Sequence, residues 1–494
     1  MKGWDATLIA RAAGADLLGE RALGAGATGP ARVSIDSRKL MDGDLFIGLP
    51  GARSDGGEHA ADALRAGAWG VLVAPAHAHA AAALGASGAV LAHPDPLAAL
   101  QALARAWRQE LRRGGTRVVA ITGSTGKTST KDILAAILAQ TLRTVSSPEN
   151  FNTEIGLPLA LLAAPGDTEA LVLEMAMRGA GQIAELAAIA EPDVGVIVNV
   201  GPVHLELLGT LEAVAAAKAE LIAELAPGAT VVVPVDEPLL APYLREDVAT
   251  VTFGDGGDFS LEDGAGPDEV VIREDARAQR LGARAGAGAR GRDGASITLR
   301  PSFRQAHNLR NLLAAVAAAR SLGITPRGRV DVQFSPLRGQ RLELARGVVL
   351  INDCYNANPM SMRAAIDDLT ETAPARRVAV LGDMLELGPG GPGLHREVGQ
   401  HASARGIELL VTVGPLAAEI AGGFTGEAHS VADAPAAAEL LGTLLRDRDT
   451  VLVKGSRGVG LERVAEALGG GSQPAGGRSA AASMFEPSAG PGRA

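Results

Sequence analysis

Residues 122–129, TGSTGKTS, follow the apolar run RVVAI and lead into a segment of helical character, KTSTKDILAAILAQ. A strand, a glycine loop and a helix in this order can wrap a phosphate in backbone N–H groups, and the helix N-terminus adds its positive dipole end. Lys127 would reach the β- and γ-phosphates, and the Thr128 hydroxyl would ligate Mg²⁺. The residues predicted to bind nucleotide on this basis are Gly123, Ser124, Thr125, Gly126, Lys127, Thr128 and Ser129.

The loop departs from the full GxxxxGK(S/T) pattern, because Ile121 stands where the first glycine would fall. An ordinary turn between a strand and a helix is therefore the alternative. The GK(S/T) triplet directly after an apolar strand still favours nucleotide binding. The chain contains no NKxD motif, which disfavours a GTPase.

Two polar residues follow the next apolar strands. The run ALVLE ends at Glu174, and His204 comes shortly after VGVIVNV. Because parallel strands end at one edge of a sheet, both residues are expected near the glycine loop, where a carboxylate can hold Mg²⁺. The alternatives are a solvated charge for Glu174 and a structural turn histidine for His204. Together with Thr128, a metal or substrate role is favoured.

Lys218 lies in the apolar stretch LEAVAAAKAELIAEL, residues 211–225. On a helix it has no acidic partner three or four residues away. Its side chain could extend to solvent, contact a phosphate, or lose its proton by burial and add CO₂ to form a carbamate that holds Mg²⁺. The residues alone favour solvent. Its helical neighbours are Val214, Ala215, Leu221 and Ile222.

The chemistry-bearing residues lie on elements that predict an α/β protein of several domains. Apolar strands alternate with helices, which is typical of mainly parallel sheets covered on both faces. Residues 254–300, rich in Gly, Asp and Arg, are expected to form hairpins or loops. The predicted domains are residues 1–94, 95–333 and 334–468, and the last resembles a Rossmann-like sheet without a dinucleotide fingerprint. A Gly-, Ser-, Ala- and Pro-rich tail, 469–494, is predicted to be disordered.

Composition excludes several classes of protein. The chain has 494 residues, too many for one core, and its formal charge of -10 disfavours binding to nucleic acid. A single cysteine, Cys354, excludes an internal disulfide and is expected to pack in the interior. The start of the chain is not typical of a signal peptide, and Ala80–Ala92 is too short to span a bilayer. A cytoplasmic protein without membrane insertion is expected, with His395 and His401 on its surface.

The order of the motifs resembles that of the Mur ligase family, bacterial ATP-dependent amide ligases that build the peptidoglycan precursor. The resemblance covers roughly residues 30–465 and implies three domains: a UDP-substrate-binding domain, a central P-loop ATPase domain and a C-terminal Rossmann-like domain. The C-terminal motifs resemble members that add D-alanyl-D-alanine to UDP-N-acetylmuramoyl-tripeptide through an acyl phosphate, giving the pentapeptide. The motifs are DSRKLMDGDLFIGLPGARSDG, TGSTGKTS, ENFNTEIGLPLALL, LEMAMRGAGQI, NVGPVHLELLGT, AKAEL, HNLRNLLAA, DCYNANPMSM, LGDMLELG and VKGSRG.

The resemblance implies a site of ATP and two Mg²⁺ ions in a monomer. It makes Lys218 a carbamylated lysine that ligates Mg²⁺ with Glu174, His204 and Thr128, and these residues act with Lys127 in catalysis. Further residues are implied at the adenine (Asn308, Asn311), beside the nucleotide (Asp353, Tyr355, Asn356, Asn358), at the uridine diphosphate (Ser37, Arg38) and at the other substrate groups (Asn152, Thr153, Lys454, Ser456, Arg457).

Three positions depart from the family pattern. Asn152-Thr153 stands where many members have Asn-Asn, Ala176 stands where glycine is common, and Val459 follows VKGSRG. The DNPR motif of the ligases that add diaminopimelate or lysine is absent. The third residue of the tripeptide therefore stays open.

Two other functions remain as alternatives. A P-loop ATPase switch would hydrolyse ATP in response to a protein partner and would need neither small substrate. A ligase of the same chemistry would use a different amine, as in folylpolyglutamate synthesis. The local motifs also have structural readings, since Asn356-Ala357-Asn358-Pro359 is typical of a helix-capping turn and Asp36-Ser37-Arg38 of a turn with an ion pair.

Overall fold

The computed structural model describes residues 1, 3–21, 29–52, 54–85, 87–148, 150–262, 266, 268–277 and 295–469. Apart from its first residue, the predicted disordered tail lies outside this part of the chain. Residues 1–103 and 104–468 form two compact units. The domain boundaries expected near residues 94 and 333 stay predictions.

The N-terminal unit is built on one five-stranded sheet in the order β1-β5-β4-β3-β2. Strand β1 runs antiparallel to β5, and the other neighbours are parallel. Every residue of β3, β4 and β5 is buried, as expected for strands covered on both faces. The elements are α1 (Ala6–Ala13), β1 (Asp16–Arg21), β2 (Val33–Ser34), η1 (Ser37–Lys39), β3 (Leu45–Ile47), η2 (Gly56–His59), α2 (Ala60–Arg65), β4 (Gly70–Val73), α3 (Pro75–Ala83) and β5 (Gly88–Ala92).

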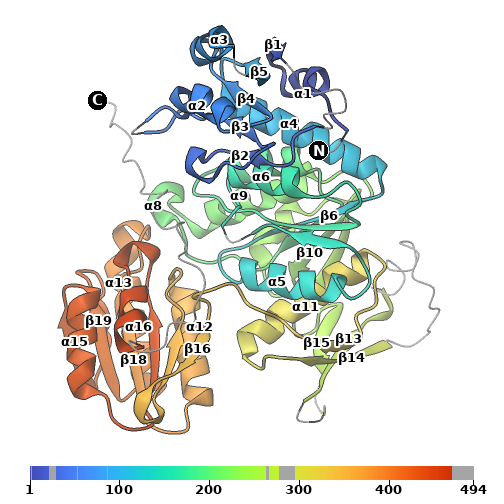
Figure 1. Ribbon diagram of the computed structural model, residues 1–494. Helices are drawn as coiled ribbons and strands as arrows, with labels where there is room; N and C mark the ends of the chain where they lie inside the picture. The colour runs from blue at the N-terminus through green and yellow to red at the C-terminus, as the bar shows by residue number, and fades with distance from the viewer. Residues whose placement is uncertain are drawn as a thin grey trace. The chain divides into compact units, whose positions relative to one another are not determined.

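The second unit contains a ten-stranded sheet in the order β15-β14-β13-β12-β11-β10-β9-β6-β8-β7 (Figure 1). Along the sheet from β7 through β8, β6, β9, β10 and β11 to β12, each strand is parallel to its neighbour. Strands β12, β13 and β14 are antiparallel to one another. The strands are β6 (Arg117–Thr122), β7 (Thr144–Ser146), β8 (Ala170–Glu174), β9 (Val194–Ile197), β10 (Thr230–Pro234), β11 (Ala249–Phe253), β12 (Phe259–Glu262), β13 (Val270–Glu274), β14 (Ala295–Pro301) and β15 (Gly328–Val330).

Helices connect these strands and carry the predicted site. The first, α4, directly precedes β6. Helix α9, which carries Lys218, begins with Thr210 as its N-cap, whose side chain accepts a hydrogen bond from Ala213 N. The helices are α4 (Pro96–Arg113), α5 (Lys127–Leu138), α6 (Gly156–Ala163), α7 (Gln182–Ala190), α8 (Leu205–Leu208), α9 (Leu211–Glu224), η3 (Pro238–Tyr243) and α11 (Ala306–Ser321).

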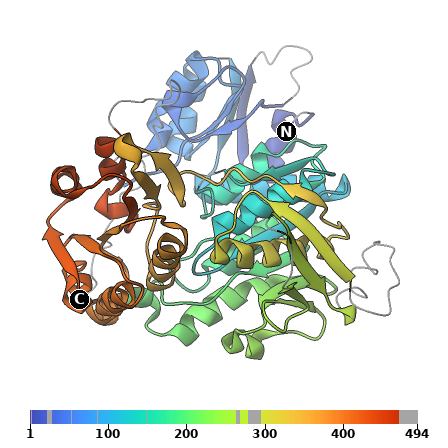
Figure 2. The ribbon, with the colours of Figure 1, turned by 90° about the horizontal axis from the view of Figure 1, so that it is seen from below.

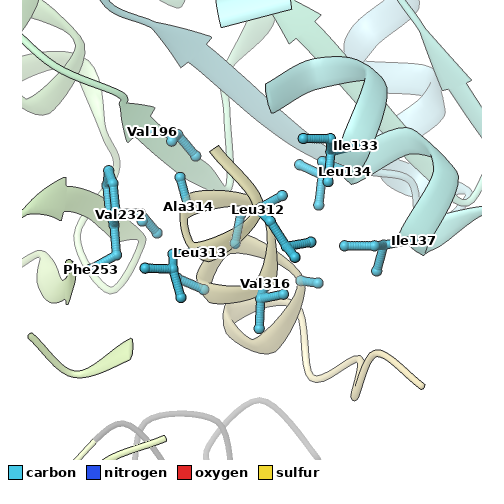
Figure 3. Packing of buried hydrophobic residues seen from close by; sticks show 14 of the residues in the cluster. Ile133, Leu134, Ile137, Val196, Val232, Phe253, Leu312, Leu313, Ala314 and Val316 are labelled. Atoms are coloured by element: carbon cyan, nitrogen blue, oxygen red, sulfur yellow. The ribbon is translucent and has the colours of Figure 1, made fainter. Parts of the chain in front are cut away.

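Helix α11 lies in the middle of the largest apolar cluster of this sheet (Figure 3). Leu312 and Val316 of α11 lie between the sheet and helix α5. Val196 and Phe253 belong to the sheet, and Ile133 belongs to α5. Eight consecutive residues of α11, 312–319, are buried, five of them alanines. Alanines allow the helix to approach the sheet closely, so α11 fixes the position of α5 and of the loop that precedes it.

The remaining residues form a six-stranded sheet in the order β16-β17-β21-β18-β19-β20, parallel except for β16. Alternate residues of β17, β18, β19 and β21 enter two separate clusters: Val378 and Val380 pack on one face, Ala379 and Leu381 on the other. Helices therefore cover both faces (Figure 2). The elements are β16 (Gln340–Glu343), η4 (Ala345–Gly347), β17 (Val349–Asn352), α12 (Pro359–Thr372), β18 (Arg377–Gly382), η5 (Gly388–Gly390), α13 (Gly391–Ala404), β19 (Leu409–Val413), α14 (Ala418–Gly423), β20 (Glu427–Val431), α15 (Ala434–Leu444), β21 (Thr450–Lys454), η6 (Arg457–Val459) and α16 (Glu462–Leu468).

The predicted α/β class with mainly parallel sheets is confirmed. The sequence did not reveal β16 or β20, because these edge strands are largely exposed and polar and lack an apolar run. The hairpins expected in residues 254–300 correspond to β12, β13 and β14 where the chain is described. Within the described residues, no helix is both long and apolar enough to cross a membrane.

His395 corrects one expectation, because it is buried in α13 rather than exposed. Its Nδ1 lies 2.7 Å from Gly391 O, and its Nε2 accepts a hydrogen bond from Met384 N at 2.9 Å. The ring is therefore neutral, with the proton on Nδ1, and burial lowers its pKa. The neutral ring is hydrogen-bonded to the segment after β18, which carries Glu386. His401 is partly exposed and pairs with Asp367.

Replacing Leu312 by alanine should lower the free energy of unfolding by about 2–5 kcal/mol, because the side chain is fully buried in the central cluster. Urea or thermal unfolding measures the change. The control is Leu261→Ala in β12, where the side chain is 44% exposed, with an expected effect within about 0.5 kcal/mol. Equal effects of the two substitutions would contradict the central place of α11.

His395→Gln should make stability less sensitive to acid. A lowered pKa means that the unfolded chain binds the proton more readily than the folded protein does. Stability from the neutral ring is therefore complete above the ordinary histidine pKa of about 6.5 and is lost as the pH falls below it. The melting temperature, measured from pH 8 to pH 5, should fall more in the wild type than in the variant.

His429→Gln is the control for this measurement, since His429 is partly exposed in β20. It should keep the wild-type dependence on pH. Parallel curves for the wild type and His395→Gln would show that His395 does not contribute to acid sensitivity.

Candidate functional site

The glycine loop joins β6 to α5 at the carboxyl edge of the ten-stranded sheet. Gly126 is the N-cap of α5 with φ 78°, and a Cβ added there would lie 2.6 Å from Asn311 Oδ1 of α11. Both the left-handed backbone and this close approach require glycine. No side chain caps the helix at this position, so its first N–H groups point toward the loop without intrahelical acceptors.

Three predicted residues meet beside the loop. Thr128 Oγ1 donates a hydrogen bond to Glu174 Oε2 at 2.6 Å, and Asn152 Nδ2 donates to Glu174 Oε1 at 2.9 Å. Glu174 is only 1% exposed at the end of β8, so its carboxylate is held by these contacts rather than by water. Thr153 caps the same region more weakly, since its hydroxyl accepts from Gly156 N at 3.4 Å.

Lys127 lies near this carboxylate, and Lys218 lies near Lys127. Lys127 Nζ donates to Gly123 O at 2.8 Å, and its pKa is lowered by burial, an effect that Glu174 opposes and Arg338 reinforces. Lys218 is 2% exposed, and burial lowers its pKa well below the usual lysine value, with the charge of Lys127 lowering it further. The sequence alone favoured a solvent-exposed Lys218, and this interpretation was wrong. The described chain offers its amine no hydrogen bond or ion pair.

Asn199, just after β9, is a residue that the sequence reasoning missed. Its Oδ1 accepts hydrogen bonds from Ser124 N at 3.1 Å and Thr125 N at 3.0 Å, and its Nδ2 donates to Thr125 O at 3.1 Å. The Ser124 hydroxyl is also engaged, since it donates to Gly201 O and accepts from Gly201 N. The only signal in the sequence was an amide residue at the end of an apolar strand.

His204 is placed differently from the other predicted metal ligands. It has a left-handed backbone, with φ 53°, and its Nδ1 lies 2.5 Å from Glu386 Oε2, while Arg178 lies 3.7 Å from Glu386 Oε1. The hydrogen bond from His204 lowers the pKa of Glu386. In the described part of the chain, no three His, Cys, Asp or Glu side chains converge on one point. Glu386 was not predicted as a site residue.

The YNANP segment follows β17. Asn358 is the N-cap of α12 in a reciprocal capping box with Ser361, which confirms the structural reading of this turn. Its Nδ2 also lies 3.4 Å from Ser124 O of the glycine loop. Tyr355 stacks with two guanidinium groups, those of Arg338 at 4.1 Å and Arg457 at 5.7 Å from its ring centroid.

The end of β21 and the loop after it carry three predicted substrate residues, Lys454, Ser456 and Arg457. Lys454 is buried, and its Nζ lies 2.7 Å from Asp353 Oδ2 and 3.0 Å from Asn356 O. Ser456 is buried too, and its Oγ accepts from Leu385 N at 2.9 Å. Arg457 is exposed. The first two side chains therefore hold this region together, whereas the guanidinium of Arg457 is open to a ligand.

The two asparagines predicted at the adenine lie in the first turns of α11, and both are buried. Asn311 Nδ2 donates to Asn308 Oδ1 at 3.3 Å. The contact with Gly126 places Asn311 beside the phosphate loop. Ser129, the last residue predicted in the loop, lies in the first turn of α5.

In the N-terminal unit, the predicted uridine diphosphate residues lie in η1. The guanidinium of Arg38 pairs with Asp36 through Nε at 2.9 Å, which lowers the pKa of that carboxyl and confirms the expected turn with an ion pair. Arg38 is exposed, and Ser37 is partly exposed. Both side chains are thus available on the surface of this unit.

Cys354 lies in the interior beside the site, as expected. Its Sγ donates to Asn352 Oδ1 at 2.8 Å. Burial raises the pKa of the thiol to about 12, so the thiolate needed for nucleophilic chemistry is not formed near neutral pH.

Comparisons with known families cover most of the chain. Residues 31–108 match the model described as Mur ligase family, catalytic domain. Residues 121–319 match the Mur ligase middle domain, and residues 337–457 match the Mur ligase, glutamate ligase domain.

Individual relatives agree with these matches. A protein of Synechocystis sp., named UDP-N-acetylmuramoyl-tripeptide–D-alanyl-D-alanine ligase, is 36% identical over 446 residues, covering 88% of this chain and 91% of its own. The structure of MurF from Acinetobacter baumannii is similar with a TM-score of 0.78 and 27% identity, covering 94% and 98% of the two chains. MurF ligase from Thermotoga maritima, solved with ADP, has a TM-score of 0.72 and 30% identity, covering 88% and 96%.

Proposed function

The chain belongs to the Mur ligase family, and we propose that it joins D-alanyl-D-alanine to UDP-N-acetylmuramoyl-tripeptide at the expense of ATP. The observation that carries this proposal is the likeness over 88% of the chain to a relative named for that reaction. A neighbour solved with ADP supports nucleotide binding at the glycine loop. One chain carries all the proposed groups, so we propose a monomer, and a lone buried thiol fits the reducing cytoplasm.

The reaction proceeds in two steps. A carboxylate oxygen of the tripeptide attacks the γ-phosphorus of ATP, and the bond between this phosphorus and the bridging oxygen breaks. ADP departs, and the tripeptide is now an acyl phosphate. The amine of D-alanyl-D-alanine then attacks the acyl carbon and loses a proton, and phosphate leaves as the amide forms. Water must be excluded while the acyl phosphate exists, because water would hydrolyse it.

Lys127, Arg338 and the amides at the start of α5 are suited to the first step. Negative charge spreads over the phosphoryl oxygens during transfer, and fixed donors stabilise it best where water is excluded. Arg338 Nε is buried and finds no hydrogen-bond partner among the described residues, which supports an anion beside it. Asn308 and Asn311 are proposed at the adenine, and Asp353, Tyr355, Asn356 and Asn358 beside the nucleotide.

Thr128, Glu174, His204 and a carbamylated Lys218 are the proposed ligands of Mg²⁺, at two sites. The cations would neutralise charge between the γ-phosphate and the acceptor carboxylate. The oxygens of Thr128 and Glu174, 2.6 Å apart, are the donor type that Mg²⁺ prefers. Glu386 on Nδ1 of His204 leaves Nε2 for a metal, as carboxylate–histidine pairs commonly do.

The environment of Lys218 supports its carbamylation. A neutral amine is needed for its nitrogen to bond to the carbon of CO₂ with loss of a proton, and burial beside Lys127 favours the neutral form. The product is an anion, which removes the repulsion between the two lysines.

The exposure of the side chains decides which residues we propose for the two ends of the substrates. Arg457 is proposed to bind the free carboxylate of D-alanyl-D-alanine, since its guanidinium fork is exposed and can bind two oxygens. Lys454 and Ser456, which are buried and engaged, position that loop. Ser37 and Arg38 are proposed at the uridine diphosphate, and Asn152 and Thr153 near the acceptor.

Phosphate release should require both substrates. With ATP and Mg²⁺ present, sustained release is expected only when UDP-N-acetylmuramoyl-tripeptide and D-alanyl-D-alanine are both added, and omission of either should reduce it to background. Release that ignores both substrates would indicate an ATPase switch instead. Release with the tripeptide and a different amine alone would indicate another ligase of the family.

Lys218→Ala should lose most of the ligase activity and regain part of it with short carboxylic acids, which can occupy the place of the carbamate. Lys218→Arg is the control. Its guanidinium fills the space, so short carboxylic acids should not restore the activity of this variant. In the wild type, ¹³C-labelled bicarbonate should give a carbamate carbon signal that both variants lack. Full activity of Lys218→Ala without added acid would reject the carbamate.

A further inference from the structure

We propose that Asn199 is a positioning residue that divides the phosphate loop into a half fixed by the protein and a half free to bind phosphate. The inference rests on the proposed use of ATP but concerns a residue that does not itself contact the nucleotide. Asn199 would hold Ser124 and Thr125 in place, so that the next four amides converge on the phosphates.

The side chain of Asn199 is matched to the loop in both hydrogen-bonding directions. Its oxygen accepts from two backbone N–H groups, and its NH₂ group donates to one backbone carbonyl, all at 3.0–3.1 Å. Only a side chain with a carbonyl and an NH₂ group on one carbon satisfies this set. Aspartate would place an oxygen against Thr125 O. Alanine would leave Thr125 N and Thr125 O without these partners, whereas Ser124 N would keep its contact with the backbone oxygen of residue 199.

Backbone and hydroxyl contacts strengthen the same attachment. Ser124 N also lies 3.2 Å from Asn199 O, and the Ser124 hydroxyl exchanges two hydrogen bonds with Gly201. A Cβ on Gly123 would lie 3.0 Å from Val198 Cβ, so the loop lies directly on the end of β9. The first half of the loop is therefore fixed by β9.

The second half of the loop is left with free donors. Helix α5 begins at Lys127, and its first internal bond from the cap is Thr130 N to Gly126 O. The N–H groups of Gly126, Lys127, Thr128 and Ser129 thus precede the first intrahelical bonds. We therefore expect these four amides to contact the phosphates, rather than those of Ser124 and Thr125, which already have an acceptor in Asn199.

The division of the loop has a direct test in the wild type. Residue-resolved hydrogen exchange should show the amides of Ser124 and Thr125 protected without nucleotide and unchanged when Mg²⁺ and ADP are added. Those of Lys127, Thr128 and Ser129 should gain protection only with ADP. Ser124 and Thr125 amides that exchange freely without ADP and become protected with it would overturn the proposal.

Asn199→Ala tests the consequence for binding. Loss of the fixed half should raise the Kd for ADP about tenfold or more, measured by calorimetric titration, and raise KM for ATP while KM for D-alanyl-D-alanine stays within about twofold. Gln140→Ala is the matched control, since its side-chain amide also binds a backbone carbonyl, Arg329 O, at an exposed position. It should leave the Kd unchanged.

The outcomes separate a positioning role from a structural one. A folded Asn199→Ala variant that exchanges rapidly at Thr125, whose amide loses its acceptor, but binds ADP like the wild type would refute the positioning role. If this variant does not fold, the exchange experiment on the wild type decides. ADP binding can be measured without either ligase substrate. If hydrogen exchange shows the divided loop but the protein does not ligate the two substrates, only the proposed function is rejected.

Discussion

The burial of Lys218 beside Lys127 is the constraint on which the rest of the site depends. Lys218 is buried and Lys127 is partly buried, and each loses hydration that normally stabilises an ammonium group. One carboxylate, Glu174, opposes this effect at Lys127, but the structure gives Lys218 no comparable partner in the described residues. Burial beside a second lysine therefore favours the neutral form of the Lys218 amine.

The sheet makes this arrangement possible. Strands β6, β8 and β9 are adjacent and parallel, so their carboxyl ends bring the glycine loop, Glu174 and Asn199 to one edge. Each of those strands pairs with a neighbour on both sides, and their residues are buried except Arg117. Helix α11 supports the same edge from the side, since its alanines lie against the strands and its Asn311 lies against Gly126 (Figure 3).

The C-terminal sheet contributes residues whose local role is structural. Asn358 caps α12, Lys454 neutralises Asp353, and Ser456 holds Leu385 N. Arg457 stays exposed, and Nε of Arg338 has no hydrogen-bond partner among the described residues. The pair of His204 and Glu386 joins the segment after β9 to the segment after β18, and its two members lie 182 residues apart in the chain.

The sequence by itself determined the α/β class, the phosphate loop and the strand-end position of Glu174, because apolar periodicity and a local glycine motif act over a few residues. It could not decide the environment of Lys218: a lysine on an apolar helix can reach solvent or stay buried, and only the packing of α9 settled that it is buried. Tertiary structure alone also revealed Asn199, Glu386 and the burial of His395. Their partners lie far away in the chain, and hydrogen bonds between distant segments leave no periodic signal in a single sequence.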